Sequence, residues 1–398
     1  MAKLSIDDLV LKNKRVLVRV DFNVPLTENL EVSDDTRIRA ALPTINKILD
    51  SNGRAILMSH LGRPKGKAVE SMRLAPVVKR LSQLLDREVK YVTDCIGDVV
   101  EETVTNLQNG EVLLLENLRF YKEEEANDPE FAKKLARLGD VYINDAFGTA
   151  HRAHASTEGV AKYFKQCAAG YLMEKELKYL GEALENPQRP FVAILGGAKI
   201  SGKIDVIENL LNKVDAILIG GGMTYTFLKA KGIEIGNSLL EADKIQLAKD
   251  VSAKISSQKI NFILPIDHVV ASTISDDAEF KTTDGQAVPA GWSAADIGPK
   301  TIAQFRSVLK NARTVVWNGP MGVFEIEKFA KGTVEVAKML AGISEHGAIT
   351  VVGGGDSVAA LAKAGVTEKI THVSTGGGAS LEFLGGLKLP GVEVLTDK

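Results

Sequence analysis

The sequence has little of what disulfide-bonded, zinc-binding or membrane-spanning proteins require. Only two of its 398 residues are cysteines, Cys95 and Cys167, and they form no CxxC motif and no Cys/His cluster with zinc spacing. We interpret both as buried thiols of a protein in the reducing cytoplasm. The N-terminus, MAKLSIDDLV, lacks the pattern of a signal peptide. Apolar runs such as VDAILIGGGM are far too short to cross a bilayer.

The chain also lacks a strong net charge and the motifs of several enzyme classes. A formal net charge of −2 provides no general attraction to nucleic acid or to an anionic membrane, so we expect neither as a partner. The glycine-rich strand ends contain neither the GxGxxG pattern of dinucleotide-binding proteins nor a complete Walker A loop. No Ser-His-Asp or paired-carboxylate signature is present to supply a general base.

What the chain does have is a regular alternation of short apolar runs with longer helical patterns. Runs that are apolar on both faces, such as KRVLVRVDF, RAILMSH, PFVAILGG and RTVVWNGP, are typical of buried parallel strands. Their alternation with helices predicts an α/β fold with two doubly wound parallel-sheet (Rossmann-like) domains. With 45% hydrophobic residues, a chain of this length can bury a large core.

The composition changes near residue 190, which suggests the domain boundary. Thirteen of the 15 arginines precede this point, whereas 26 of the 36 glycines follow it. Just before it, apolar residues recur at helical spacing: Leu172, Met173, Leu177, Leu180 and Leu184. Asn186-Pro187 would end such a helix. We therefore predict one domain over 1–170, a connecting helix over 171–186 and a second domain over 187–384.

Polar and basic residues follow the predicted strands of the first half. Ligands of open parallel sheets bind beyond the carboxyl ends of the strands. The residues near these ends are Asp21, Asn23, Arg37, His60, Arg63, Arg119 and Arg152. The charged fork of arginine matches carboxylate and phosphate oxygens, so the set suits a small, multiply charged acid. Each arginine taken alone could be a solvated surface charge, and Asp21 and Asn23 could merely begin a turn.

The strands of the second half end in glycine-rich segments: GGAK, GGGM, WNGPMGVFE, GGGDS and STGGGAS. Glycine lets backbone N–H groups approach phosphates closely, although tight strand-to-helix packing also selects it. Residues 197–203, GAKISGK, come near a Walker A loop, but Ile204 replaces the metal-binding Ser or Thr. A helix starting here would place Lys199 and Lys203 on one face. Asp356 could then bind Mg²⁺ instead.

The segments RVDFNVPL, SHLGRP, LENLRF, DAFGTAHRAHAS, GGAK, WNGPMGVFE, GGGDS and STGGGAS resemble, in order and over nearly the full chain, those of the phosphoglycerate kinase family. The resemblance implies reversible transfer of the acyl phosphate of 1,3-bisphosphoglycerate to Mg-ADP, giving 3-phosphoglycerate and ATP, in glycolysis and gluconeogenesis. It also implies a cytoplasmic, bilobal monomer with a hinge. Residues 385–398 would join the first domain, and the lobes would close during catalysis.

The matching motifs imply roles for individual residues. Phosphoglycerate would be held by Asp21, Asn23, Arg37, His60, Arg63, Arg119 and Arg152. The nucleotide would be held by Gly197, Lys199, Lys203, Gly221, Asn318, Glu325, Gly354, Gly355, Asp356 and Ser357, with Glu325 on the ribose and Asp356 on Mg²⁺. Ser357 stands where threonine is common, and its hydroxyl could cap the following helix. Ala294 stands where we expect a glycine near the base.

The chemistry expected of such a site needs no general base, because a carboxylate acceptor is already ionised at neutral pH. Catalysis would rest on positioning and on charge neutralisation by Arg37, Lys199, Lys203, Mg²⁺ and the backbone N–H groups of Gly376, Gly377 and Gly378. Two alternatives remain at this point. An NAD-dependent dehydrogenase would need GxGxxG. A non-enzymatic two-lobe anion-binding protein would explain the arginines, but not the separate set of lysines, glycines and Asp356.

Overall fold

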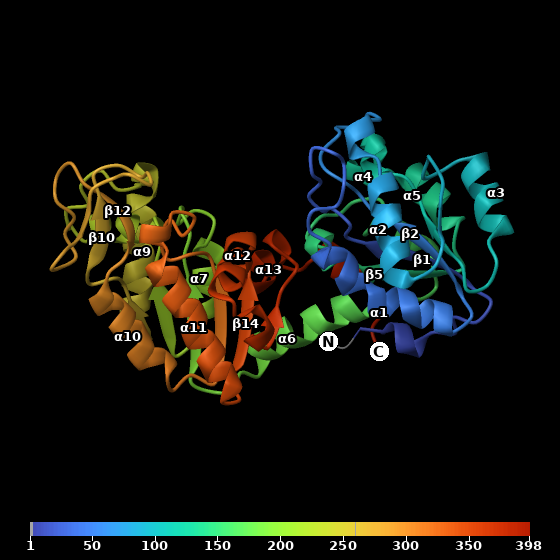
Figure 1. Ribbon diagram of the computed structural model, residues 1–398. Helices are drawn as coiled ribbons and strands as arrows, with labels where there is room; N and C mark the ends of the chain where they lie inside the picture. The colour runs from blue at the N-terminus through green and yellow to red at the C-terminus, as the bar shows by residue number, and fades with distance from the viewer. Residues whose placement is uncertain (1–2, 259) are drawn as a thin grey trace. The chain divides into compact units, whose positions relative to one another are not determined.

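The computed structural model describes residues 3–258 and 260–398, which form two compact units (Figure 1). Unit 1 comprises the chain up to Lys178 together with Lys388–Lys398, and unit 2 comprises Tyr179–Leu387. The division falls inside helix α6, Tyr171–Glu185, which ends just before Asn186-Pro187. Each unit contains a six-stranded parallel sheet, which confirms the predicted α/β fold class. No helix in the described part of the chain is long and apolar enough to span a membrane.

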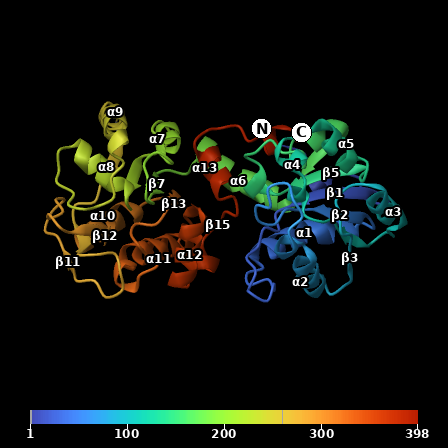
Figure 2. The same cartoon turned by 90° about the horizontal axis from the view of Figure 1, so that it is seen from above.

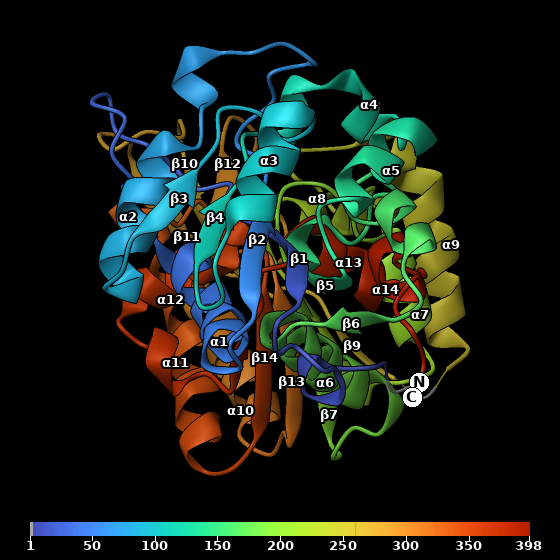
Figure 3. The same ribbon diagram turned by 90° about the vertical axis from the view of Figure 1, so that its right-hand side faces the viewer.

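The sheet of unit 1 has the strand order β3-β4-β2-β1-β5-β6, which can be followed across Figure 3. Its strands are β1 Arg15–Val20, β2 Arg54–Met58, β3 Val89–Tyr91, β4 Val112–Leu114, β5 Val141–Asp145 and β6 Cys167–Ala169. The α-helices are α1 Thr36–Asp50, α2 Ala75–Leu85, α3 Asp98–Asn106, α4 Lys122–Glu125, α5 Pro129–Ala136 and α14 Pro390–Glu393. Short 3₁₀ helices are η1 Ile6–Asp8, η2 Glu70–Met72, η3 Leu118–Phe120, η4 Phe147–Thr149 and η5 Gly159–Tyr163.

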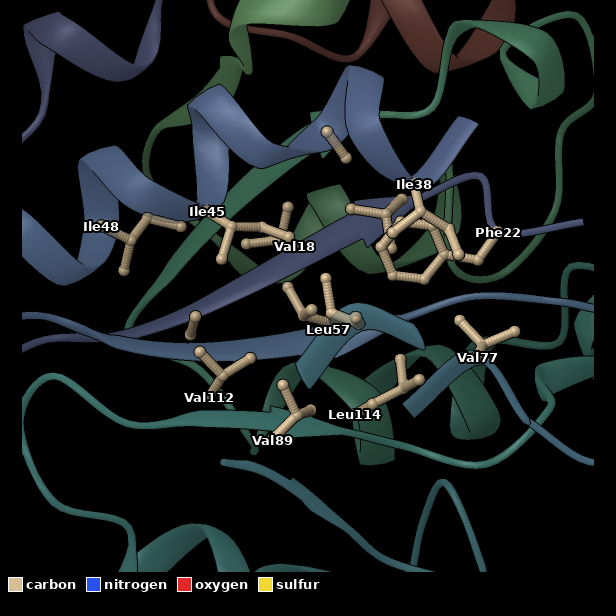
Figure 4. Close-up of a cluster of buried hydrophobic side chains, with 14 of the residues drawn as sticks. Val18, Phe22, Ile38, Ile45, Ile48, Leu57, Val77, Val89, Val112 and Leu114 are labelled. Carbon is tan, nitrogen blue, oxygen red and sulfur yellow. The ribbon is translucent and has the colours of Figure 1, made fainter. Parts of the chain in front are cut away.

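Alternation along β1 divides its side chains between the two faces of the sheet. Val16, Val18 and Val20 join a core cluster with α1 and α2, where Ile38 and Ile45 pack against the strands (Figure 4). Each fully buried aliphatic side chain of this kind stabilises the fold by about 1.5–3 kcal/mol. The other residues of β1, including Arg19, lie on the opposite face. Helices α1 and α2 therefore cover one face, and α5 lies over the other (Figure 2).

The last eleven residues complete unit 1. The backbone of Thr396 accepts a hydrogen bond from Leu4 N at 2.7 Å and donates one to Cys167 O at 2.9 Å, so the C-terminal segment is tied to the N-terminal segment and to β6. The Asn144 side-chain amide donates to Gly391 O at 2.9 Å. Leu395 is 2% exposed. The chain thus returns to unit 1 after unit 2 and buries apolar surface there.

The main sheet of unit 2 has the order β15-β14-β13-β7-β8-β9. Its strands are β7 Phe191–Leu195, β8 Ala216–Ile219, β9 Asn261–Ile263, β13 Thr314–Asn318, β14 Ile349–Gly353 and β15 His372–Val373. The helices are α7 Ile204–Leu210, α8 Met223–Ala230, α9 Ile245–Ser256, α10 Pro299–Leu309, α11 Lys331–Glu345, α12 Gly355–Ala364 and α13 Gly378–Leu384, with η6 Ala242–Lys244, η7 Glu327–Phe329 and η8 Thr367–Lys369. Helices α10, α11 and α12 cover one face, and α7, α8 and α9 the other (Figure 2).

Unit 2 also contains a small antiparallel sheet that the sequence pattern did not indicate. Its order is β11-β10-β12, with β10 His268–Ala271, β11 Phe280–Thr282 and β12 Ser293–Ile297. All three residues of β11 are exposed, and the first two residues of β12 are only partly buried. These strands therefore lack the runs, apolar on both faces, that revealed the parallel strands.

The C-terminal return provides a test of what holds unit 1 together. Replacing Leu395 by alanine removes a buried side chain, so Leu395→Ala should lower the free energy of unfolding of unit 1 by about 2–5 kcal/mol. Leu387, eight residues earlier, is 49% exposed, and Leu387→Ala should change it by less than about 0.5 kcal/mol. Urea denaturation followed by circular dichroism measures both. An effect of Leu395→Ala as small as that expected of Leu387→Ala would show that the Leu395 side chain adds little to the stability of unit 1.

Candidate functional site

The strand ends of unit 1 bring several of the expected phosphoglycerate residues together. Asp21 and Asn23 follow β1, and Arg37 lies in the first turn of α1. Arg37 Nη1 donates to Asp21 Oδ2 at 2.7 Å, with 37% of the arginine side chain still exposed. The Asn23 side-chain carbonyl accepts from Gly62 N at 2.8 Å and so fixes the loop after β2. His60 lies in the same group, with its Nδ1 4.0 Å from Asp21 Oδ1.

Arg119 is the deepest of the expected arginines, with 6% of the residue exposed. It lies in η3, where its Nη1 donates to Gly62 O at 3.0 Å. Its Nε lies 3.4 Å from Glu125 Oε1 but has no hydrogen-bond partner. Burial and the nearby cations Arg19 and Arg152 lower the pKa of Arg119. This excess of positive charge over counter-charge favours the binding of an anion.

Arg63 and Arg152 are more exposed than the rest of the set. Arg63 lies in the loop after β2, and no ion pair of the described residues involves it. Arg152 Nε donates to His151 Nε2 at 3.1 Å. Two exposed arginine forks next to a buried one form a rim that a small anion can contact from solvent.

A buried polar frame that the sequence pattern did not reveal supports this rim. Asn117 is fully buried, and its Nδ2 donates to both Leu61 O and Met72 O at 2.8 Å, which holds the two ends of the loop containing Arg63. Asn117 Oδ1 accepts from Arg119 N at 3.1 Å. One asparagine thus fixes both arginine-bearing segments. Its position as the last residue of the predicted strand segment EVLLLEN was the available signal.

A second missed group lies on the face of β1 opposite the apolar core. Arg19, Glu124 and Ser156 are all fully buried. Arg19 Nε donates to Ser156 Oγ at 2.8 Å, and Ser156 Oγ in turn donates to Glu124 Oε1 at 2.5 Å. Arg19 Nη2 also lies 3.1 Å from His60 Nδ1. An arginine in the middle of an apolar run, VLVRVDF, could have suggested this pairing.

In unit 2, most of the expected nucleotide residues line one pocket of about 440 Å³ at the carboxyl ends of the strands. They are Gly197, Lys199, Lys203, Asn318, Gly354, Gly355, Asp356 and Ser357, and the expected catalytic residue Gly377 lines the same pocket. Lys203 is 8% exposed and its ammonium donates to the Asn318 side-chain carbonyl. Burial lowers the pKa of Lys203 to about 8, although the Asp356 carboxylate opposes this shift. The Asn318 side-chain amide nitrogen is buried without a partner.

A neighbouring pocket of about 230 Å³ includes Gly221, Ala294 and Glu325, together with apolar Leu239 and Val323. Gly221 has φ +68°, and a Cβ there would lie 2.5 Å from Gly197 N, so only glycine fits. The two pockets share Gly197, Ala198, Pro320 and Asp356. The space around Lys203 is therefore continuous with the space beside Gly221 and Glu325.

Three local expectations differ from the structure. Helix α7 begins at Ile204, so Lys199 precedes it and does not share a helical face with Lys203. Ser357 does not cap α12, whose N-cap is Gly354; instead its Oγ accepts from Gly319 N at 2.7 Å. The N–H of Gly376 is already bonded to Ser374 Oγ at 3.1 Å, whereas Gly377 and Gly378 line the pocket. For Ser357, the partner is 38 positions away along the chain, so local spacing could not predict it.

The residues of unit 2 could hold a divalent cation only if a bound phosphate group supplied further oxygen ligands. Within the described ranges, no group of three or more His, Cys, Asp or Glu side chains could hold a metal ion. Asp356 offers one exposed carboxylate in the first turn of α12, beside the pocket that contains Lys203. Magnesium is commonly held by one or two carboxylates plus phosphate oxygens and water.

Comparison with known proteins gives a consistent result. A model of the phosphoglycerate kinase family matches residues 6–387. The chain is 59% identical over 397 residues to the phosphoglycerate kinase of Chlorobium phaeobacteroides, covering all of both chains, and 59% identical over 406 residues to that of Acidobacterium capsulatum, again with full coverage. Among solved structures, the phosphoglycerate kinase of Coxiella burnetii is similar, with 43% identity, 98% coverage of each chain and a TM-score of 0.89.

The buried ammonium of Lys203 predicts opposite effects on stability and activity. A folded-state pKa of about 8, below the ordinary 10.5, means that charged Lys203 destabilises the fold below pH 8 and that this cost disappears as pH rises towards 10.5. Lys203→Met should therefore raise the free energy of unfolding by about 1–3 kcal/mol at pH 7, less at pH 9.5, while abolishing activity. Urea denaturation at both pH values tests this. Lys199→Met, at an exposed lysine, is the control. If the increase in the free energy of unfolding caused by Lys203→Met were larger at pH 9.5 than at pH 7, the charged Lys203 ammonium would not be the source of the cost.

Proposed function

The chain belongs to the phosphoglycerate kinase family of phosphotransferases, and from this premise we propose that it transfers the acyl phosphate of 1,3-bisphosphoglycerate reversibly to Mg-ADP. The products of this step are 3-phosphoglycerate and ATP. The observation that carries the proposal is the presence of two different anion sites in one chain. Unit 1 has an arginine cluster around buried Arg119, and unit 2 has a glycine-lined pocket with buried Lys203. The purely anion-binding alternative accounts for the first site but not the second.

In unit 1, the proposed ligand is phosphoglycerate. Arg63, Arg119 and Arg152 bind its charged groups, since guanidinium forks pair with phosphate and carboxylate in a bidentate manner. Asp21 and Asn23 bind its hydroxyl and also order the site, because they hold Arg37 and the Gly62 loop. Buried His60, which lies beside Asp21, is the remaining proposed ligand contact. Residues 1–170 with the returning C-terminal segment thus make up the acid-binding domain.

In unit 2, the proposed ligand is ADP or ATP. The phosphates would occupy the pocket of about 440 Å³, which is lined by Gly197, Lys199, Lys203, Gly354, Gly355 and Ser357. The ribose and base would occupy the neighbouring pocket, which is lined by Gly221 and Glu325. Asn318 has an unpartnered buried amide that can donate to the nucleotide. Ala294 lines the wall of the base space. Asp356 would hold Mg²⁺, which when bound neutralises charge on the phosphate oxygens.

The reaction requires positioning rather than proton transfer. In the reverse direction the attacking group is the 3-phosphoglycerate carboxylate, which carries no proton at neutral pH. Charge spread over the transferred group then needs cationic and N–H partners, which Arg37, Lys199, Lys203 and the N–H groups of Gly377 and Gly378 provide. Arg37 uses only Nη1 on Asp21, so its other N–H groups remain to donate to this group. We further propose that the enzyme acts in the cytoplasm as a monomer, a setting consistent with two free buried cysteines.

A coupled assay for ATP formation from 1,3-bisphosphoglycerate and ADP tests the proposed reaction, and Arg37 tests its mechanism. Arg37→Ala removes a cation that acts on the transition state, so kcat should fall by a factor on the order of 10² or more, with a smaller change in KM. Arg39→Ala is the matched control, because Arg39 is two residues further along α1 and pairs only with Asp35 among the described ion pairs. A near-normal kcat with a raised KM would assign Arg37 to uniform binding.

Asp356 tests the metal assignment. Asp356→Ala should raise KM for Mg-ADP at least about tenfold, because a carboxylate ligand of the cation is lost. Binding of 3-phosphoglycerate to unit 1 should stay unchanged in isothermal calorimetry. Asp205→Ala is the control, since Asp205 is an exposed acid in the first turn of α7 and lines neither pocket. Equal loss of both ligands would indicate misfolding, and no loss would remove Asp356 from the site.

A further inference from the structure

The contact between Arg19 and His60 determines where the imidazole carries its proton. Arg19 Nη2 and His60 Nδ1 are 3.1 Å apart in a fully buried setting. A guanidinium has five N–H donors, no acceptor, and is never deprotonated in proteins. The bond can therefore form only if His60 Nδ1 has a free lone pair. Asp21 Oδ1, the other candidate partner of Nδ1, lies 4.0 Å away, beyond hydrogen-bond distance.

The rest of the network holds Arg19 in this orientation. Arg19 Nη1 donates to Val20 O, and Nε donates to Ser156 Oγ at 2.8 Å. Because Ser156 Oγ accepts from an obligate donor, its own hydrogen goes to Glu124 Oε1, while Ser156 N donates to Glu124 Oε2 at 2.9 Å. Both Glu124 oxygens thus accept hydrogen bonds, as an ionised carboxylate does. Glu124 balances the buried charge of Arg19 through one serine hydroxyl.

We propose that Arg19 is a positioning residue that holds His60 as the neutral Nε2–H tautomer, so that His60 offers the substrate a hydrogen-bond donor and no charge. This inference rests on the proposed function only for the identity of the substrate. His60 is 3% exposed, and no hydrogen bond from its Nε2 to another described residue is present. Nε2–H is therefore the donor left for a ligand oxygen.

The surroundings of His60 are consistent with a neutral ring. Burial, followed by the cations Arg19, Arg119 and Arg37 and by His154, lowers the pKa of His60 well below its ordinary value. The Asp21 carboxylate at 4.0 Å is the facing acid, and it is already paired with Arg37. A further cation in this arginine-rich site would add like-charge repulsion, whereas a neutral N–H adds a directional bond without it.

Nitrogen-15 NMR of the full-length protein with labelled histidine tests the tautomer directly. The His60 signals are identified by their loss in His60→Gln. We expect a pyridine-type Nδ1 and a protonated Nε2 at pH 7.5, with no change down to pH 5.5. A protonated Nδ1, or an imidazolium at pH 7.5, would overturn the proposal. Because this measurement needs no substrate, it stands even if the chain fails to bind 3-phosphoglycerate, which would refute the proposed function instead.

A pair of substitutions tests which nitrogen serves the ligand. The glutamine amide can occupy the place of Nε2–H, whereas the asparagine amide reaches only as far as Nδ1. Calorimetric Kd values for 3-phosphoglycerate should therefore rise about tenfold more in His60→Asn than in His60→Gln, the loss expected for one hydrogen bond to a charged ligand. Equal losses in the two variants, or a larger loss in His60→Gln, would contradict donation from Nε2.

Arg19→Lys tests the positioning role, with Arg15→Lys as its control. Lysine keeps a positive charge for Glu124 but cannot bridge Ser156, Val20 and His60 at once. We expect the His60 signals to show a mixture of tautomers in Arg19→Lys. Arg15 lies four residues earlier in β1 and pairs with Asp140 at 2.7 Å, so Arg15→Lys should leave the His60 signals unchanged. Unchanged His60 signals in Arg19→Lys would show that Arg19 does not set the tautomer.

Discussion

Burial of both faces of each parallel sheet is the constraint on which the rest of this structure depends. Helices cover the strands on either side, so polar groups within a strand have almost no access to water. Asp21, Asn23 and His60 accordingly appear where β1 and β2 end, and Asn318 and Gly354 appear where β13 and β14 end. Chemistry is confined to one edge of each sheet because that edge is where the backbone leaves the apolar layers.

The two proposed sites offer different groups to an anion. Unit 1 presents guanidinium groups, whose fork geometry can match a small acid with two charged groups. Unit 2 presents glycine backbone and one buried ammonium, Lys203, which would suit a phosphate chain that lies close to the main chain. The same difference is visible in the composition of the chain, because most arginines precede residue 190 and most glycines follow it.

Buried polar groups, and not surface ion pairs, organise the site of unit 1. Glu124 balances Arg19 through Ser156, and Asn117 fixes the segments that carry Arg63 and Arg119. Such groups stabilise the fold only while all of their hydrogen bonds are made, since an unpaired buried charge costs several kcal/mol. Asn117 thereby orders the backbone of the segments that carry Arg63 and Arg119, which lowers the entropy that these segments lose when a ligand binds.

The sequence by itself determined the fold class, the parallel strands with long apolar runs, the connecting helix and the placement of the candidate site residues at one edge of each sheet. It could do so because these features depend on periodicity and on the order of residue types along the chain. Tertiary structure alone decided the small antiparallel sheet, the start of α7 at Ile204 and the role of Ser357. It also decided the partners of Arg19. Ser156 is 137 positions from Arg19, and His60 is 41, so no local pattern can show that one buried guanidinium joins them.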